Sequence, residues 1–147
     1  MAIAERTAET VWQGTLARGE GTVTPASGAF GPLPVTWASR TEQPGGKTSP
    51  EELAAAAHAA CFAMALNLRL GEHKAEPSRL TVSATVTLDE VAGRPTIVSS
   101  VLTVRGVVPG LDAAEFQVAL DEAADLCPVS RLFAGASITI DGQLVSD

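Results

Sequence analysis

Two cysteines are the residues of this chain best suited to covalent chemistry, because a thiolate is both a nucleophile and a metal ligand. Cys61 and Cys127 lie far apart in the sequence, so they form neither a C-x-x-C redox motif nor a zinc-binding pair. Taken singly, each is more simply explained as a small buried hydrophobic residue. In a reducing cytosol a cysteine pair rarely forms a permanent structural disulfide, so a role in thiol chemistry remains an alternative.

A reactive Cys61 would need a cation beside it. The residues around it are alanine, phenylalanine and methionine, and burial among such side chains raises the pKa of a thiol. Arginine is the natural partner, since it stays charged and donates several hydrogen bonds. Arg40, just before a glycine-containing loop, is the first candidate and Arg18 the second. Glu51 is the candidate carboxylate that would orient the arginine.

The spacing of Glu51 and Cys61 poses a geometric problem. Glu51 precedes Cys61 by ten positions, which corresponds to about 15 Å along an unbroken helix. The two side chains can share a site only if the helix is broken between them or if a second subunit contributes.

Histidine offers a different chemistry. His58 lies three residues before Cys61, and this H-x-x-C pair could begin a zinc site with Cys127 and His73. No second closely spaced ligand pair exists, so we expect no metal. His58 is predicted to be a hydrogen-bonded core residue and His73 a solvent-exposed residue at a helix end.

The element that must position Cys61 is a long helix. Ser49 is a suitable N-cap, Pro50 fits the first helical position and Glu52 completes an S-x-x-E capping box. Gly71 is predicted to end the helix. Apolar residues form two faces, so we expect other structure to surround the helix. One face carries Leu53, Ala57, Ala60, Met64 and Leu68, and the other Phe62, Leu66 and Leu70.

Cys127 is predicted to end a second helix. Asp112 and Glu115 form a capping box at its start, and Pro128 either interrupts it or begins a short new helix. Its apolar stripe comprises Phe116, Leu120, Ala123 and Cys127. If the two helices pack together, the two thiols could meet in a dry pocket.

The remaining segments read mainly as strands, which predicts an α+β fold in a single domain of residues 1–147. Gly45 and Gly46 mark a sharp loop before the long helix. Leu80–Leu88 alternates between apolar and hydroxyl side chains and begins an antiparallel hairpin. The other predicted strands are Thr10–Leu16, Gly21–Thr24, Leu33–Arg40 and Ser137–Val145.

Composition excludes several classes of partner. The chain carries 10 Lys and Arg against 17 Asp and Glu, a net charge of −7, which argues against nucleic acid. The first residues lack the apolar core of a signal peptide, and no basic amphipathic helix suggests a membrane surface. The uncharged run Leu53–Leu68 is shorter than the roughly 20 residues of a membrane span. A cytoplasmic protein with no membrane partner is expected.

Several runs of sequence together resemble a known family. The most specific are SPEELAAAAHAACFAMAL and the later CPVS, supported by VWQGTLARGEGTV, LDEV and VVPGLDAAEF. They resemble the OsmC proteins, the osmotically inducible branch of the OsmC/Ohr organic hydroperoxide reductase family. The resemblance covers essentially the whole chain.

The resemblance implies antiparallel sheets packed around two central helices in an intertwined homodimer, with two active sites at the subunit interface. The family's peroxidatic cysteine matches Cys61 and its resolving cysteine Cys127. The carboxylate of the P-E motif matches Glu51 and the arginine of the OsmC branch matches Arg40. The hydroperoxide-resistance branch places its arginine earlier, where this chain has Arg18.

The implied activity is a thiol-dependent peroxidase without a cofactor, acting on organic hydroperoxides and less well on hydrogen peroxide. Cys61 would become a sulfenic acid and form a disulfide with Cys127, which a dithiol reductant of the dihydrolipoyl kind would reduce. Apolar walls from Phe62, Met64 and Phe133 are expected to favour organic substrates. Two rival functions are a non-catalytic module that binds a hydrophobic ligand and a thiol-based peroxide sensor. The lack of a basic DNA-binding segment argues against the sensor.

Overall fold

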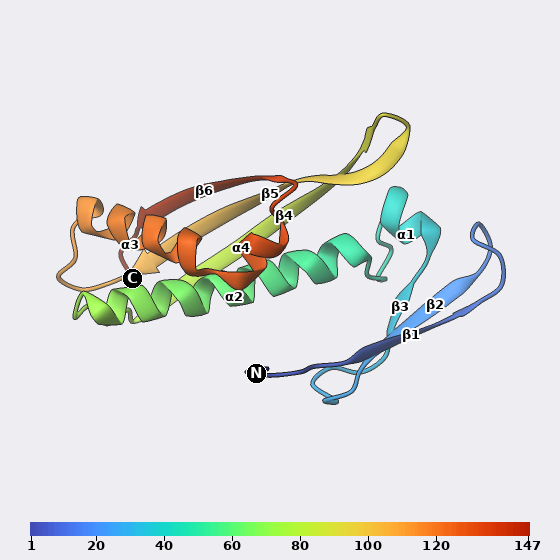
Figure 1. The fold of residues 1–147 in the computed structure, drawn as a ribbon, viewed down its shortest axis with the longest axis horizontal. Coiled ribbons are helices and arrows are strands. Elements are labelled where there is room, and N and C mark those ends of the chain that lie inside the picture. The colour runs from blue at the N-terminus through green and yellow to red at the C-terminus, as the bar shows by residue number, and fades with distance from the viewer. The chain divides into compact units, whose positions relative to one another are not determined.

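A computed structural model describes all residues from 1 to 147, which form two compact units, Met1–Leu53 and Ala54–Asp147. Each unit contains one three-stranded sheet. A long helix, α2 (Pro50–Glu72), begins in the first unit and continues through the second (Figure 1). The predicted single domain stays a prediction.

The first unit is built on an antiparallel sheet of β1 (Ala8–Gln13), β2 (Glu20–Pro25) and β3 (Leu33–Val35). The predicted strand Leu33–Arg40 is wrong beyond Val35, because a short helix, α1 (Trp37–Thr41), follows. Its cause is a capping box. The Thr36 hydroxyl accepts from the Ser39 backbone N–H, and the Ser39 hydroxyl accepts from the Thr36 backbone N–H.

Helix α2 begins at Pro50 as predicted, with the Ser49 hydroxyl accepting from the Glu52 backbone N–H at 3.1 Å. The second half of the predicted capping box is replaced, since the Glu52 carboxylate accepts from the Thr48 hydroxyl at 2.7 Å. Gly71 does not end the helix, which continues to Glu72. The left-handed conformation, with φ of 58°, falls at Lys74 instead.

The second unit has a mixed sheet of β4 (Arg79–Val91), β5 (Arg94–Val107) and β6 (Ser137–Leu144), in that order. The predicted hairpin is confirmed, because β4 and β5 pair antiparallel around a turn at Ala92 and Gly93. The prediction of purely antiparallel sheets is wrong for β6, which runs parallel to β5. The helices between these strands, α3 (Ala113–Leu126) and α4 (Pro128–Leu132), form the crossover that parallel pairing requires.

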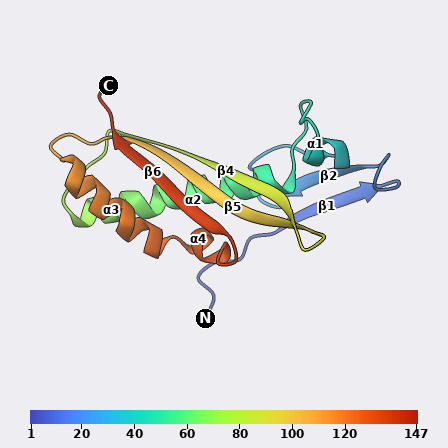
Figure 2. The same ribbon diagram turned by 90° about the horizontal axis from the view of Figure 1, so that it is seen from above.

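Helices α2 and α3 lie on the same face of this sheet (Figures 1 and 2). Asp112 and Glu115 form the predicted capping box of α3. The predicted stripe of α3 is buried, ending at Cys127 with no exposed surface. The core comprises Phe62, Ala65, Leu66, Leu70, Ala75, Leu102, Val104, Val108, Phe116, Ala119, Leu120, Ala123 and Cys127.

The two apolar faces of α2 have different environments. Phe62, Leu66 and Leu70 have no exposed surface, whereas Met64 and Leu68 are 74% and 54% exposed. Within one chain, the expectation that other structure surrounds the helix is therefore wrong. The exposed face forms one wall of an open groove, whose lining residues are Ala60, Ala63, Met64, Asn67, Leu68 and Pro77 to Leu80.

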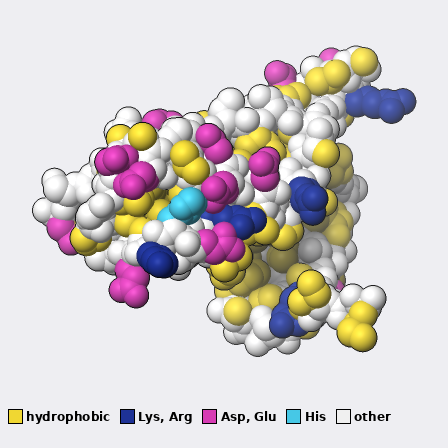
Figure 3. Space-filling model, turned by 60° about the vertical axis from the view of Figure 1, so that its left-hand side comes forward, with side chains coloured by type: hydrophobic (Ala, Val, Ile, Leu, Met, Phe, Trp, Pro, Cys, Tyr) yellow, Lys and Arg dark blue, Asp and Glu magenta, His cyan; other side chains and the backbone are white.

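By length and composition alone, the whole of α2 would qualify as a membrane span. The uncharged run Leu53–Leu68 within it is too short to qualify. Helices in the cores of soluble proteins pass the same test. The face in Figure 3 carries acidic side chains with hydrophobic ones exposed between them.

Candidate active site

The two cysteines meet at the edge of the core of the second unit. Cys61 lies near the middle of α2 and is partly buried, while Cys127 is fully buried where α3 ends and α4 begins. The Cys61 thiol is within hydrogen-bonding reach of the Cys127 thiol, and both cysteines are free. The two thiols therefore meet, as the packing of the two helices was expected to allow.

Burial is the main influence on the Cys61 thiol and raises its pKa. A hydrogen bond from the Val129 backbone N–H acts in the opposite direction, and the neighbouring Cys127 thiol raises the pKa further. Because the raising effects prevail, the second unit by itself keeps Cys61 as a thiol at neutral pH. A cation brought to Cys61 would lower the pKa and release the thiolate nucleophile.

Arg40 and Glu51 form a close ion pair within the first unit. The Arg40 Nε donates to both carboxylate oxygens of Glu51, at 3.0 and 3.2 Å, and Nη2 donates to Oε1 at 2.8 Å. The Glu51 side chain is 10% exposed and that of Arg40 30% exposed. These bonds hold the plane of the guanidinium and leave its Nη1 hydrogens for another acceptor.

The elements around the ion pair explain its geometry. Arg40 is in the last turn of α1 and Glu51 in the first turn of α2. The intervening loop reverses at Gly45 and Gly46, both with positive φ, and the Ser39 hydroxyl donates to the Thr48 carbonyl across it at 2.9 Å. The carboxylate also gains from its position at the positive end of the α2 dipole.

An apolar hollow of about 340 Å³ lies next to Arg40 in the first unit. The Arg40 guanidinium lies 5.9 Å from the centroid of the Trp37 ring, which adds a cation–π contact. The lining residues are Thr10, Trp12, Leu16, Val23, Val35, Thr36, Trp37, Arg40, Pro50 and Leu53. Trp12 and Trp37 thus frame a hollow beside a cation.

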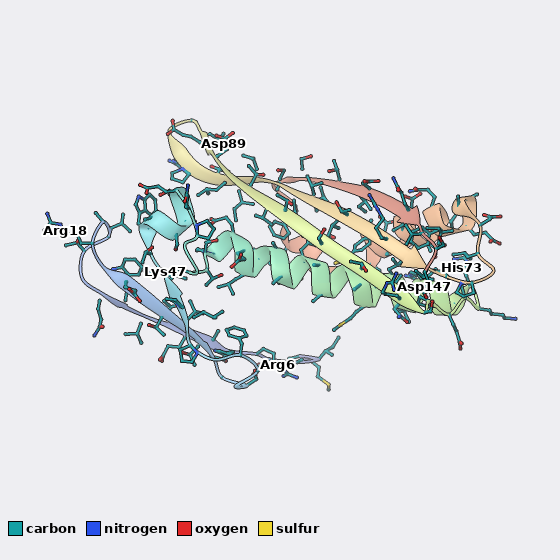
Figure 4. The ribbon with its side chains drawn as sticks, turned by 180° about the vertical axis from the view of Figure 1, so that it is seen from behind. Arg6, Arg18, Lys47, His73, Asp89 and Asp147 are labelled. Atoms are coloured by element: carbon teal, nitrogen blue, oxygen red, sulfur yellow. The ribbon has the colours of Figure 1, made fainter.

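Arg18, the second candidate cation, lies in the loop between β1 and β2 and is exposed. Figure 4 shows its side chain pointing away from the strands. Its backbone N–H donates to the Thr15 hydroxyl, but its guanidinium has no carboxylate partner. The carboxylate-oriented arginine of the first unit is therefore Arg40.

The helix that connects Glu51 to Cys61 is unbroken. About 15 Å of helix axis thus separates them, and the first of the two expected solutions, a broken helix, does not apply. The site residues fall into two groups, each with its own geometry: the thiol pair in residues 54–147 and the arginine–carboxylate pair in residues 1–53.

The two histidines have other partners in the structure. His58 is a hydrogen-bonded core residue, as predicted, with both ring nitrogens bound to serine hydroxyls. His73 is exposed and pairs with Glu122 at 2.9 Å. No group of three or more His, Cys, Asp or Glu side chains is close enough to hold a metal ion. The serine partners of His58 were missed in the sequence, which gave no signal for pairing across 42 and 72 positions.

Residues 43–141 match the family model described as OsmC-like protein. The chain belongs to the OsmC-like family. It is 43% identical over 135 residues to the protein named Peroxiredoxin OsmC from Escherichia coli strain K12, covering 92% of this chain and 93% of the relative. The predicted resemblance to the OsmC branch is confirmed.

Other members extend the comparison. The chain is 35% identical over 92 residues to the Organic hydroperoxide resistance protein of Xanthomonas axonopodis pv. citri, covering 62% of this chain and 63% of that protein. The crystal structure of the Organic Hydroperoxide Resistance Protein OhrB of Bacillus subtilis matches this OsmC-like fold with a TM-score of 0.71 at 27% identity. That match covers 95% of this chain and 98% of OhrB.

Proposed function

We propose that this OsmC-like protein is a thiol-dependent peroxidase that reduces organic hydroperoxides. The observation that carries the proposal is the contact between two free thiols, one partly buried and one fully buried, in a chain 43% identical to a peroxiredoxin. The relatives named for peroxiredoxin activity and for organic hydroperoxide resistance support the same reaction class. Cys61 is the attacking thiol because it is the more accessible of the two.

In the first step the Cys61 thiolate attacks the distal oxygen of the hydroperoxide. The O–O bond breaks, an S–O bond forms, and the departing alkoxide takes a proton to leave as an alcohol. The Val129 N–H and the free Nη1 hydrogens of Arg40 would stabilise the thiolate and the charge that develops on the leaving oxygen. Glu51 would keep the guanidinium oriented without itself reacting.

In the second step Cys127 attacks the sulfur of the Cys61 sulfenic acid. A disulfide forms, the S–O bond breaks and water leaves with the Cys127 proton. A dithiol reductant, of the kind a dihydrolipoyl group provides, then exchanges with the disulfide and restores both thiols. The reaction needs no other cofactor.

A homodimer would complete the active site. Arg40 of one chain would serve Cys61 of its partner, since the unbroken helix keeps Glu51 and Cys61 of one chain apart. The exposed face of α2, with Met64 and Leu68, is an apolar surface that a second copy would cover. In that assembly residues 1–147 act as one OsmC-like domain with two sites at the interface. Sedimentation of the pure protein at the mass of one chain would contradict this arrangement.

The hollow beside Arg40 gives a physical reason for preferring organic hydroperoxides, because its Trp and aliphatic walls suit an alkyl or aryl group. Of the three expected walls, Phe62 has no exposed surface and Phe133 is 9% exposed, whereas Met64 is 74% exposed and open to a substrate within one chain. The rate constant for cumene hydroperoxide should exceed that for hydrogen peroxide. Equal rate constants would remove the proposed role of the hollow.

The expected environment of the protein is the cytoplasm, where thiols are kept reduced and a dithiol donor is available. A buried α2 in an OsmC-like dimer needs no membrane, and the net charge of −7 disfavours nucleic acid as a partner.

A Cys127→Ser variant provides the direct test of the reaction. Reduced wild-type protein treated with one equivalent of cumene hydroperoxide should lose both thiols and the mass of two hydrogens, whereas Cys127→Ser should gain one oxygen as a trapped sulfenic acid. Intact-mass spectrometry, combined with a reagent that labels sulfenic acids, measures both changes in mass. Because a serine hydroxyl in this fully buried position costs about 1–3 kcal/mol, Cys127→Ala is the companion variant. Survival of both wild-type thiols would instead favour a module that binds a hydrophobic ligand.

A further inference from the structure

A fully buried histidine lies one helical turn before Cys61. The His58 Nδ1 is 2.6 Å from the Ser100 hydroxyl oxygen of β5, and Nε2 is 2.8 Å from the Ser130 hydroxyl oxygen of α4. The imidazole also lies 5.1 Å, centroid to centroid, from the Phe133 ring. The His58 side chain thus connects α2, β5 and α4.

Both ring nitrogens of His58 are occupied, which limits what this residue can do. Burial lowers the pKa of His58, so the imidazole is neutral, with one nitrogen that donates and one that accepts. One serine hydroxyl therefore accepts from the ring and the other donates to it. With no free nitrogen and no exposed surface, His58 serves neither as a base toward the peroxide nor as a metal ligand.

The bond to Ser130 connects His58 to the groups that face Cys61. Ser130 belongs to α4, which follows directly after Cys127, and the Val129 N–H of the same turn donates to the Cys61 thiol. A helix of this length is not stable by itself, and Cys127 provides no side-chain cap for it. The position of this turn against α2 thus depends on tertiary contacts, among which the His58–Ser130 bond is a directional one.

We propose that His58 is a positioning residue for disulfide formation, holding the first turn of α4 so that the Cys127 thiol faces the sulfenic sulfur of Cys61. This inference rests on the peroxidase function proposed above. In the step concerned, the Cys127 sulfur attacks the Cys61 sulfur, the S–S bond forms, the S–O bond breaks and hydroxide leaves as water with the Cys127 proton. Such a displacement needs the three atoms in line, so a small shift of α4 slows it steeply.

Two substitutions of His58 separate its two hydrogen bonds. The amide of asparagine reaches the place of Nδ1, and the amide of glutamine reaches the place of Nε2. His58→Asn therefore keeps a partner for Ser100, whereas His58→Gln keeps a partner for Ser130. Both variants bury one amide in place of the ring, so each controls for the general effect of altering the core.

The experiment measures two steps in reduced protein mixed with cumene hydroperoxide, namely formation of the Cys61 sulfenic acid and its closure to the disulfide. We expect closure in His58→Asn to be at least about tenfold slower than in His58→Gln, while their rates of sulfenic acid formation differ by less than about threefold. Ser130→Ala should behave like His58→Asn, and Ser100→Ala like His58→Gln. Each of the two serine variants removes only one hydroxyl, so the test stays valid if the histidine variants do not fold.

Equal closure rates in the matched variants, with rapid closure in the wild type, would overturn the role of His58 and leave the peroxidase function intact. Absence of any sulfenic acid or disulfide in the wild type would overturn both. If His58 had a merely structural role, the closure rates of the four variants would follow their thermal stability and not the loss of the bond to Ser130. That pattern would also overturn the inference.

Discussion

A Cys61→Ser variant should lose the reaction with cumene hydroperoxide, with a rate constant at least about a thousandfold below that of the wild type. The serine hydroxyl has the size of the thiol but is not a nucleophile of comparable strength and cannot form a sulfenic acid. Cys61 is partly buried, so the substitution should leave the fold intact. Stopped-flow consumption of the hydroperoxide under single-turnover conditions measures the rate.

The matched control for this variant is Cys127→Ala, because it removes the other thiol from the same contact. It should react with its first equivalent of hydroperoxide at close to the wild-type rate and then stall. A Cys61→Ser variant that consumed hydroperoxide as fast as Cys127→Ala would exclude Cys61 as the attacking residue.

An Arg40→Gln variant should have the second largest effect, a loss of about a hundredfold to a thousandfold in the same rate constant. Arg40 is proposed to stabilise both the thiolate and the leaving oxygen, and its removal leaves burial as the main influence on the pKa of Cys61. Burial favours the neutral thiol, so the pKa of Cys61 rises and the alkylation rate of Cys61 becomes half-maximal at a higher pH. Iodoacetamide labelling across a pH series measures the shift.

Two further variants distinguish the role of Arg40 from loss of stability. Removal of Arg40 alone leaves the nearly buried Glu51 carboxylate unpaired, which costs a few kcal/mol, so Arg40→Gln combined with Glu51→Gln is the stability-matched form. Arg18→Gln is the charge-matched control, since its exposed side chain has no carboxylate partner. Equal losses in Arg18→Gln and Arg40→Gln would contradict the choice of Arg40.

Local signals in the sequence predicted much of the framework. The Asp112–Glu115 capping box and the alternation in Leu80–Leu88 report interactions between near neighbours, and the structure confirms both elements. The stripe that ends at Cys127 predicted burial in the same way. These features depend on spacing alone, which a single sequence displays directly.

Other features depend on partners distant in the chain and could not be predicted. The bonds of His58 join positions that only the β5–α4 packing brings together. The parallel pairing of β6 follows from the length and path of the α3–α4 crossover, not from the alternation within Ser137–Leu144. The α1 helix was missed although its Thr36–Ser39 capping box is a local interaction, because Ser39 is not the Glu or Gln that marks such a box in a sequence.

The exposure of one face of α2 explains why the pattern of this helix was misleading within one chain. Apolar residues on two faces predict burial of both, yet Met64 and Leu68 remain exposed. Such a pattern records every surface a helix buries in its working assembly, including those that a second subunit covers. The expectation of a dimer came from the family resemblance and not from periodicity.

Complementation between two inactive variants tests the shared site most directly. Cys61→Ser keeps Arg40, and Arg40→Gln keeps Cys61, so a mixed dimer holds one complete site if each site combines residues of both chains. Unfolding and refolding an equal mixture should restore about a quarter of wild-type activity, since about half of the dimers are mixed and each has one intact site. Activity no greater than the mean of the two separate variants would show that Arg40 does not serve the cysteine of the partner chain.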